Sequence, residues 1–394
     1  MVKKEIEKIL EVKFIRPIDY SEWMANVVPV KKPIGEIKVC TDFRDLNKAC
    51  PKDDFSLPNI DMIIDSLAGY EMLSFMDGFL GYNQIKIKES DQHKTTFRTP
   101  WGNFFYKVMP FDLKNARVTY QRAMTAMFHD FIHKTMEVYV DDILVKSKKK
   151  GDHMNDIKAT FDRMRQYKLR IKPQKCVFRV SSRKRLGHIV SRRGIEVDPK
   201  KIKAIIEMSP PTNLKQLRSI QGKIQAVRRF ICQLTDKVAP MSHFLKKEIE
   251  FKWDAKCQEA FEKIKEYLLH PPVLAPYRHG EPLWLYISAT EHAFGVMLAK
   301  KEEDGKERAV YFISQTLKDY ETRYTPIEKL CQCIVFAIER LRHYMINSVT
   351  HVLTKADPLR YLMTKPYLNG RSTKWVMLLQ EFDLRFVKQQ LVKG

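Results

Sequence analysis

The sequence predicts an α+β protein of more than one domain, in which an antiparallel sheet covered by helices precedes a separate α/β domain. The chain has 394 residues, more than one typical domain holds. Between residues 70 and 180, short apolar strands alternate with segments of helical periodicity. From about residue 272 a new pattern begins, with three strand-like segments and one long helical segment.

Composition indicates a folded protein with a nucleic-acid partner. Hydrophobic residues make up 44% of the chain, which argues against disorder, and 70 Lys plus Arg against 47 Asp plus Glu leave a net charge of +23. A polyphosphate-binding surface needs such an excess, although a merely soluble basic protein or one bound to anionic lipid would share it. No apolar run approaches the roughly 20 residues of a membrane span, and the first residues lack the apolar region of a signal peptide.

The seven cysteines are scattered, without the paired spacing of a zinc site or a disulfide framework. They suit a reducing compartment. We therefore expect an intracellular protein that is not secreted, cytoplasmic or alternatively nuclear.

The first half is expected to form strands and helices in alternation. Residues 8–48 are strand-rich, and residues 61–70 have helical spacing. Short strands are expected in the segments LSFMD, GYNQIKIK, TTFRT and FFYKVMPF. The helical segment NARVTYQRAMTAMFHDFIHK follows, with Tyr120, Met124, Phe128 and Phe131 on one face.

Two short apolar strands then meet at paired aspartates in MEVYVDDILVKS, before a helix in MNDIKATFDRMRQYKLRI. Further along, Asp198 and Pro199 have the positions of an N-cap and a first helical residue. An apolar stripe at helical spacing runs from Leu214 to Phe230. The cations largely off that stripe form either a solvated face or a phosphate-tracking one: Lys215, Arg218, Lys223, Arg228 and Arg229.

The C-terminal pattern predicts the α/β domain. Its strand-like segments are LWLYISA, FGVMLAK and AVYFIS, and its long helix is IEKLCQCIVFAIERLRHYM.

Three carboxylates suggest chemistry at a sheet edge. The turn at Asp141 and Asp142 would by itself most often be an ordinary hairpin turn. Asp77, however, ends the strand LSFMD, and a neighbouring strand of the same sheet could bring it beside Asp141. Phosphoryl transfer uses two divalent cations held by such hard oxygen ligands.

An ordered set of blocks resembles the reverse transcriptases of gypsy-type long-terminal-repeat retrotransposons, whose pol polyproteins also supply protease and integrase. The blocks are FIRPIDYSEWMANVVPVKK, KVCTDFRDLNKA, LSFMDGFLGYNQIKI, KTTFRTPWGNFFYKVMPF, TYQRAMTAMF, YVDDILVKS and LGHIVSRRGIEVDPKKI. The resemblance implies a right-hand polymerase followed by a ribonuclease H-like α/β domain. Fingers and palm would span 1–195, thumb and connection 196–275, and a degenerate, truncated ribonuclease H-like domain 276–394.

The same resemblance implies roles for individual residues. Asp77, Asp141 and Asp142 match the catalytic metal ligands of the palm. The matches to the nucleotide-binding region are Lys38, Arg44, Tyr82, Phe111 and Gln121, with Tyr82 as the gate against a ribose 2′-hydroxyl. Leu186, Gly187 and His188 match the primer grip. A buried core tyrosine and an ordinary strand are the structural alternatives for Tyr82 and for the primer-grip segment.

The ribonuclease H-like segment departs from its family pattern. Glu328 matches one catalytic carboxylate, but Ser288 and Lys355 stand where two aspartates are expected, and the last position lies beyond residue 394. Because that fold cleaves RNA with metals held by clustered carboxylates, we expect little or no ribonuclease H activity.

The polymerase segment also departs from the pattern. Asp112 and Arg117 replace family glycines, Lys38 replaces an arginine, and Arg183 and Arg185 precede the primer grip.

The resemblance implies an RNA- and DNA-templated DNA polymerase that uses two Mg²⁺ ions, with Mn²⁺ as the alternative. Its partners would be an RNA template, a DNA primer and template, dNTPs and the rest of a pol polyprotein, with no membrane. Two other functions stay open. One is a decayed nucleic-acid-binding relic, and the other is a metal-dependent nuclease of an unrelated fold.

Overall fold

The computed structural model describes residues 2–31, 37–79, 81–185, 187–245, 249–364 and 370–389. Contacts divide the chain into two compact units. One contains Met1–Pro58 and Glu71–Val180, and the other contains Asn59–Tyr70 and Ser181–Gly394. Each unit combines helices with mainly antiparallel sheets, which confirms the predicted α+β class. The boundaries after residues 195 and 275 stay predictions.

In the first unit, one five-stranded sheet has the order β1-β6-β5-β2-β3. Its strands are β1 (Ile15–Ile18), β2 (Ala25–Lys31), β3 (Ile37–Asp42), β5 (Phe97–Thr99) and β6 (Gly102–Tyr106). The accompanying helices are α1 (Val2–Glu11), α2 (Arg44–Ala49) and α4 (Glu89–Gln92). The expectation of a strand-rich start missed α1, whose Ile6 is buried in the core beneath this sheet.

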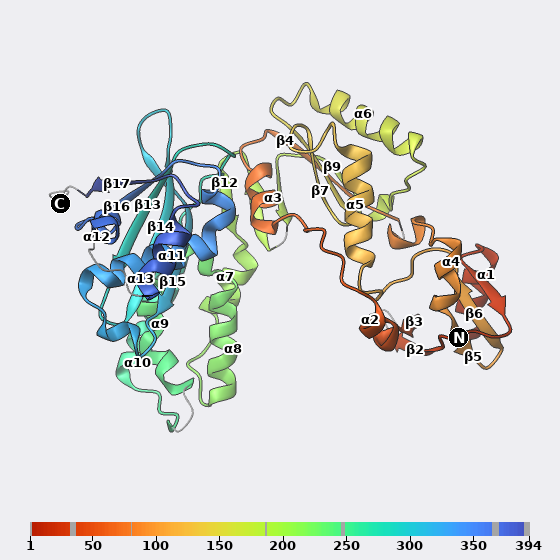
Figure 1. The fold of residues 1–394 in the computed structure, drawn as a ribbon, viewed down its shortest axis with the longest axis horizontal. Helices are drawn as coiled ribbons and strands as arrows, with labels where there is room; N and C mark the ends of the chain where they lie inside the picture. The colour runs from red at the N-terminus through yellow and green to blue at the C-terminus, as the bar shows by residue number, and fades with distance from the viewer. Residues whose placement is uncertain are drawn as a thin grey trace. The chain divides into compact units, whose positions relative to one another are not determined.

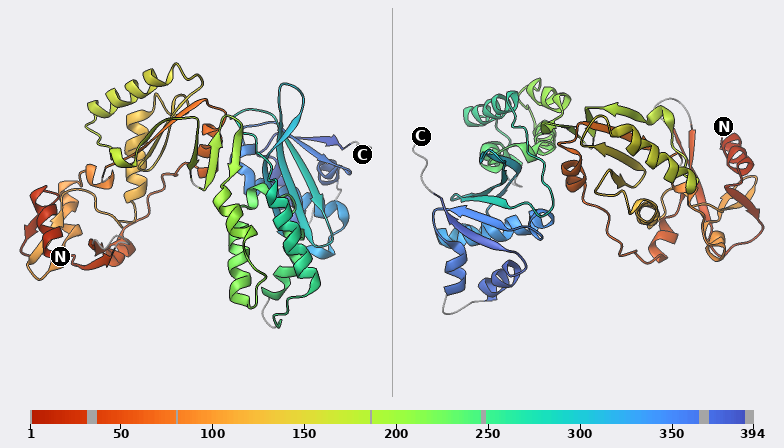
Figure 2. Two further views of the ribbon diagram at one scale, coloured as in Figure 1. Left: turned by 180° about the vertical axis from the view of Figure 1, so that it is seen from behind. Right: turned by 90° about the horizontal axis from the view of Figure 1, so that it is seen from above.

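The second sheet of this unit carries the paired aspartates, in the order β7-β8-β4-β9. Its strands are β4 (Met72–Asp77), β7 (Met136–Tyr139), β8 (Asp142–Ser147) and β9 (Val177–Val180). The helices α5 (Ala116–Phe128) and α6 (His153–Gln166) pack on it (Figures 1 and 2). Tyr120, Met124 and Phe128 are fully buried, as the periodicity predicts. The strand expected in GYNQIKIK was wrong, because residues Gly81–Gln84 form a 3-10 turn.

The second unit begins with α3 (Ile60–Leu67), a helix separated in sequence from the rest of the unit. Beside it lies a three-stranded sheet of β10 (Ser182–Arg185), β11 (His188–Ser191) and β12 (Gly194–Val197). The α-helices described after it are α7 (Pro199–Ile206), α8 (Leu214–Gln225), α9 (Leu234–Ser242) and α10 (Ala255–Leu269). Asp198 caps α7 by accepting from the Lys200 N–H at 3.1 Å, as predicted.

The predicted helix from Leu214 to Phe230 ends early. α8 stops at Gln225, and Arg228–Phe230 form a 3-10 turn. Neither expectation for Arg229 was right, because its side chain is only 3% exposed and pairs with Asp65 of α3. A basic side chain outside the apolar face of a helical segment can therefore still be buried, when it forms an ion pair with a carboxylate distant in sequence.

The α/β domain completes this unit with a five-stranded sheet in the order β15-β14-β13-β16-β17. Its strands are β13 (Leu283–Ala289), β14 (Ala293–Lys301), β15 (Glu307–Thr316), β16 (Thr350–Thr354) and β17 (Leu384–Lys388). The helices are α11 (Pro326–Met345), α12 (Pro358–Thr364) and α13 (Gly370–Leu379), which share a core with the sheet (Figure 1). β16 runs parallel to both β13 and β17. Among all the described helices, none has the length and apolarity to cross a bilayer.

Candidate active site of the first unit

The paired aspartates lie at a strained turn between β7 and β8. Val140 has φ of 54°, a left-handed conformation that is uncommon for a β-branched residue. Gln121 on α5 holds this turn from the core. Its Oε1 accepts the Val140 N–H at 2.7 Å, and its Nε2 donates to the Val138 carbonyl at 3.2 Å. Both ends of this buried amide therefore serve the turn that presents the aspartates.

Strand register brings the third aspartate to the same turn. β4 and β8 pair with Asp77 directly opposite Asp142, so their side chains leave the same face of the sheet. The Gly78 N–H donates to the Asp141 carbonyl at 3.0 Å, which extends the pairing past the end of β4. Asp77 therefore lies at the same edge of the sheet as the adjacent Asp141 and Asp142, although more than sixty residues separate it from them.

The residue after Asp77 has to be glycine for a steric reason. A Cβ on Gly78 would lie 2.9 Å from the Tyr120 hydroxyl, which is in the core of the sheet. That hydroxyl is buried without a hydrogen-bond partner among the described residues. Burial, and secondarily the nearby Asp141, raise the pKa of Tyr120 far above its ordinary value, so its phenol stays neutral.

A pocket of about 210 Å³ opens between the aspartates and two aromatic rings. Its lining includes Asp77, Asp141, Tyr82, Phe111 and Lys175. Tyr82 meets Phe111 edge to face at 5.3 Å between ring centroids, so each ring fixes the other. Burial raises the pKa of the Tyr82 hydroxyl, and a hydrogen bond from Arg117 opposes this rise.

The site suits a hard divalent cation by its donor chemistry, since carboxylates and a carbonyl converge there. Asp77 has a protein cation beside it, because the Lys175 Nζ lies 3.1 Å from its Oδ2. In the part of the chain that the structure describes, no three acidic, histidine or cysteine side chains are yet arranged around one point. Metal binding would therefore require the carboxylates to turn and Lys175 to yield its place on Asp77.

The other predicted nucleotide-binding residues lie around the first sheet. Lys38 belongs to β3 opposite Val30, and its side chain is outside the described part. Arg44 begins α2 and forms a bidentate ion pair with Asp42, although 82% of its side chain is exposed. This pair lowers the pKa of Asp42 and raises that of Arg44. Arg44 is not among the described residues that line the 210 Å³ pocket.

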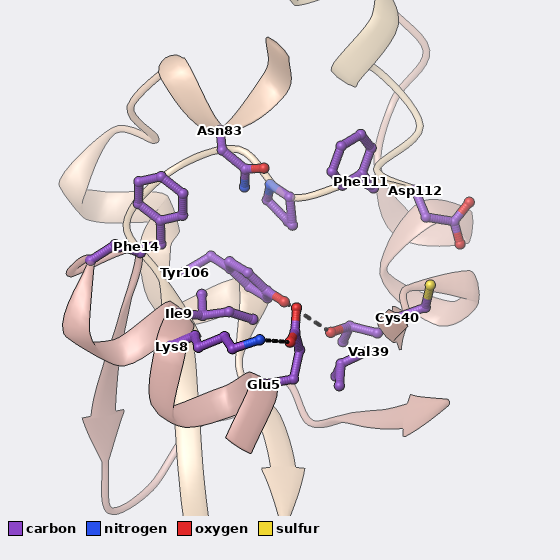
Figure 3. Close-up of a pocket in the computed structure, with 13 residues that line it drawn as sticks. Glu5, Lys8, Ile9, Phe14, Val39, Cys40, Asn83, Tyr106, Phe111 and Asp112 are labelled. Atoms are coloured by element: carbon purple, nitrogen blue, oxygen red, sulfur yellow. Dashed lines mark hydrogen bonds and ion pairs between the residues drawn. The ribbon is translucent and has the colours of Figure 1, made fainter. Parts of the chain in front are cut away.

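A larger pocket of about 540 Å³ shares Phe111 with the 210 Å³ pocket in its lining (Figure 3). Figure 3 shows Glu5 and Lys8 of α1 on one wall, with Phe111 and Asp112 on another. Asp112 has φ of 73°, and its carbonyl accepts from Asn47 at 2.7 Å. An aspartate thus occupies a left-handed position that glycine adopts without strain, and it adds a carboxylate beside Phe111.

The predicted primer-grip residues belong to the second unit. Leu186 lies outside the described residues. Gly187 has φ of 86°, and a Cβ there would lie 2.5 Å from the Lys201 Nζ, at the end of a flexible side chain. His188 opens β11 and packs against Phe230 at 5.6 Å between ring centroids. Burial, followed by the charges of Arg229 and Lys201, lowers the pKa of His188 to about 4, so the ring is neutral at pH 7.

Glu328 has a structural role in α11. It completes a capping box with Thr325, and its Oε1 lies 3.0 Å from the Arg371 guanidinium. Ser288 and Lys355 line a separate pocket of about 470 Å³, and Glu328 is not part of that lining. The residues that match the ribonuclease H catalytic positions are therefore split between a helix cap and a pocket.

Sequence patterns did not identify several residues of the site. Lys175 was not among the predicted site residues, and no spacing links it to Asp77. The link arises because the segment before β9 returns along β4, where the Lys172 N–H donates to the Asp77 carbonyl at 2.8 Å. Tyr120 was expected only as a core residue, and its place under Gly78 is likewise visible only in three dimensions.

Comparisons with known proteins match both parts of the chain. A reverse transcriptase (RNA-dependent DNA polymerase) family model matches residues 30–190, and a model of the RNase H-like domain found in reverse transcriptase matches residues 253–352. The chain is 30% identical over 389 residues to the retrovirus-related Pol polyprotein from transposon 297, and 29% identical over 402 residues to that from transposon opus, both of Drosophila melanogaster. It is 27% identical over 368 residues to the transposon Tf2-3 polyprotein of Schizosaccharomyces pombe.

The chain covers 36%, 40% and 27% of these three relatives, and 98%, 98% and 91% of its own length is matched. Among solved structures, the foamy viral protease-reverse transcriptase in complex with RNA/DNA hybrid matches with a TM-score of 0.85 and 18% identity. The match covers 100% of this chain and 54% of the other. A second foamy viral structure, in complex with double-stranded DNA, has a TM-score of 0.84, with coverage of 100% and 83%. These likenesses confirm the predicted polymerase fold followed by a ribonuclease H-like domain.

Proposed function

The chain belongs to the reverse transcriptases of gypsy-type long-terminal-repeat retrotransposons, and from that premise we propose that it is an RNA-directed and DNA-directed DNA polymerase. The observation that carries this proposal is the register of β4 and β8, with Asp77 opposite Asp142 and Asp141 one residue away at the same edge. Asp77 and Asp141 also line the same pocket, and carboxylate oxygens at one sheet edge are the hard ligands that divalent cations prefer.

Asp77, Asp141 and Asp142 are the residues that would hold Mg²⁺, with Mn²⁺ as the substitute. When bound, two such ions supply charge for phosphoryl transfer, lowering the pKa of the primer 3′ hydroxyl and neutralising the triphosphate. Gln121 fixes the turn that aims two of the three carboxylates. Lys175 holds the third in place until a cation arrives.

The aromatic wall supports selection of the sugar. Tyr82 is wedged between Phe111 and Tyr120, with ring centroids 5.3 and 5.6 Å away. A ring held on two sides cannot swing aside, so a bulky substituent on a bound nucleotide would collide with it. We propose that Tyr82 and Phe111 contact the incoming nucleotide, with Lys38 and Arg44 near its phosphates. Leu186, Gly187 and His188 would position the primer.

We also propose that the ribonuclease H-like domain has little hydrolytic activity. Ser288 and Lys355 bring a hydroxyl and a cation to the pocket where metal-binding carboxylates would be needed, and Glu328 is engaged by Arg371. An RNA template, a DNA primer and dNTPs are the proposed partners, with the remainder of a Pol polyprotein. The proposed location is intracellular.

Primer extension tests the polymerase assignment. The purified chain should extend oligo(dT) on poly(rA) in the presence of Mg²⁺. The double substitution Asp141→Asn plus Asp142→Asn should reduce incorporation by more than about 100-fold, since even residues one shell outside a metal are worth roughly 10–100-fold. Asp162→Asn is the matched control, because Asp162 is an exposed residue of α6 that pairs with the exposed Arg165. If the double variant still extends the primer, the assignment of the polymerase site to these aspartates is wrong.

A decayed nucleic-acid-binding relic is the second candidate, and Asp112 favours it. Its carboxylate is beside Phe111 and would repel a triphosphate. In that case the chain would bind the primer-template tightly without extending it. Nicking of the template that survives the double variant would instead indicate a nuclease that uses another site.

A further inference from the structure

The 470 Å³ pocket of the second unit lies at the carboxyl ends of two parallel strands. β13 and β16 are in register from Leu283 opposite Thr350 to Tyr286 opposite Leu353. Continuing this register by two residues sets Ser288 level with Lys355, on the same face of the sheet as Tyr286. Ligands of open α/β sheets commonly bind outside the carboxyl ends of the strands. The pocket has the size of many small-ligand sites.

The chemistry of the lining is cationic and hydrogen-bonding. Among the described residues that line the pocket, Lys355 is the only one with a charged side chain. Its ammonium makes no ion pair or hydrogen bond with a described residue, and the residue is exposed. The polar groups beside it include Ser288, Thr354 and Gln389, whose N–H donates to the Thr354 carbonyl at 3.1 Å. Tyr286 adds no negative charge, because burial first and its hydrogen bond to Glu307 second raise the pKa of its hydroxyl.

These residues do not fit a divalent cation. A metal ion would meet an ammonium group and one neutral hydroxyl where it needs carboxylate oxygens. Glu328, which matches a family carboxylate, does not line the pocket and is held by Arg371 and the α11 cap. An oxyanion fits these residues better than a cation does, because it accepts a charge-assisted hydrogen bond from Lys355 and a neutral hydrogen bond from Ser288.

We propose that this pocket binds a phosphate group of nucleic acid directly through Lys355 and Ser288, without a metal. We infer an anionic ligand because Lys355 is the single charged side chain among the described lining residues. We infer that the anion is a phosphate of nucleic acid because the chain has a net charge of +23 and belongs to the reverse transcriptase family. The pocket then anchors the backbone of a bound strand at the ribonuclease H-like domain, where it contributes affinity and no cleavage. The proposal rests on the nucleic-acid-binding part of the proposed function and not on polymerase chemistry.

The test is the salt dependence of binding. A labelled RNA/DNA hybrid is titrated with the full chain from about 50 to 200 mM salt. Each phosphate contact contributes roughly 0.7–0.9 to the slope of log K against log salt. Lys355→Gln should therefore lower the slope by about one and weaken binding roughly 5–8-fold at 0.1 M salt. Lys355→Arg should preserve the slope. Lys306→Gln is the matched control, since Lys306 is an exposed lysine of the same domain in the turn after β14.

A second measurement reports on the pocket itself. Lys355 should be protected from acetylation by the hybrid, with Lys306 still labelled, and Ser288→Asp should abolish that protection by placing a carboxylate beside the ammonium. Protection by inorganic phosphate at matched ionic strength would support the same anion chemistry and show that a free phosphate also enters. An unchanged slope in Lys355→Gln, or labelling of Lys355 unaffected by the hybrid, overturns the proposal. If the wild-type chain does not bind the hybrid at all, the proposed nucleic-acid-binding function itself is wrong. If the chain binds the hybrid but does not extend a primer, only the polymerase proposal fails, and the proposal for this pocket still stands.

Discussion

Arg229→Leu should destabilise the second unit more than any surface substitution. The Arg229 Nη2 lies 2.8 and 3.0 Å from the two carboxylate oxygens of Asp65, and the exposed fractions of the two side chains are 3% and 0%. The Tyr344 hydroxyl donates to the same carboxylate at 2.6 Å. The guanidinium also lies over the Tyr311 ring, 4.6 Å from its centroid. One ion pair therefore joins α3, the turn after α8 and the α/β domain.

The magnitude follows from burial. Removing one partner of a buried ion pair leaves an uncompensated charge and costs roughly 3–5 kcal/mol, because water cannot replace the lost contact. The double substitution Asp65→Leu plus Arg229→Leu removes both charges and should cost less than the single one. Arg342→Leu is the surface control. Its partner Glu381 and Arg342 are each about half exposed, at 46% and 49%, and such pairs are worth less than about 1 kcal/mol.

The loss should depend on pH in a defined direction. Burial raises the pKa of Asp65, and Arg229 and the hydrogen bonds from Tyr344 and Tyr277 oppose that rise. Without Arg229 the folded-state pKa rises further above the unfolded value of about 3.9. A raised folded pKa stabilises the fold at low pH, and this stability is lost as pH rises through the folded pKa. The variant should therefore regain up to about 2 kcal/mol between pH 7 and pH 5.5, at about 1.4 kcal/mol per pH unit.

Native-state hydrogen exchange gives the required measurement, because two units in one chain preclude a single two-state transition. Peptides from α3 and α11 should lose protection in Arg229→Leu, whereas peptides from α5 in the first unit should not. A loss below about 1 kcal/mol, or an equal loss at both pH values, would refute the idea that an uncompensated buried charge dominates the energy of this contact.

Three further substitutions probe the first unit. Asp112→Gly should raise the free energy of unfolding by roughly 0.5–1 kcal/mol, because glycine adopts the left-handed φ of 73° without strain. It should also lower the KM for dNTP, because it removes a carboxylate that would repel the triphosphate. An unchanged melting temperature would contradict the strain argument. Lys175→Gln should lower the Mg²⁺ concentration for half-maximal extension, because it removes the ammonium group that pairs with Asp77, and a higher requirement would show that the lysine assists metal binding. Gln121→Ala should cost roughly 1–3 kcal/mol and reduce extension, since it leaves the buried Val140 N–H without its acceptor; normal stability in thermal melts would mean that another group takes over the bond.

The strands and helices with strong periodicity were predictable from sequence. The face of α5 that carries Tyr120, Met124 and Phe128 is buried as expected, because helical spacing decides which side meets the sheet. The cap at Asp198 formed because its chemistry is local. Residues Gly81–Gln84 misled the prediction, because alternation in a short segment cannot distinguish a strand from a 3-10 turn.

The candidate site was predictable in part. Apolar strands on both sides of Asp141 and Asp142 predict the hairpin, and the family blocks point to Asp77. The place of Gln121 near the template and nucleotide stays a prediction, and the structure adds that its amide holds the Val140 turn. Nothing in a linear pattern indicates that a polar residue of α5 will meet a backbone N–H nineteen residues later.

The sequence by itself determined the fold class, the family and the three acidic residues at the end of β4 and the β7–β8 turn, since these depend on short-range pattern and on motif order. Only the tertiary structure decided that Asp77 stands opposite Asp142, that Lys175 pairs with Asp77, and that Arg229 is buried against Asp65. The physical reason is that strand register and side-chain burial are set by contacts between segments far apart in the chain. The sequence gives the charge of each side chain, but it does not show which residue that side chain will contact.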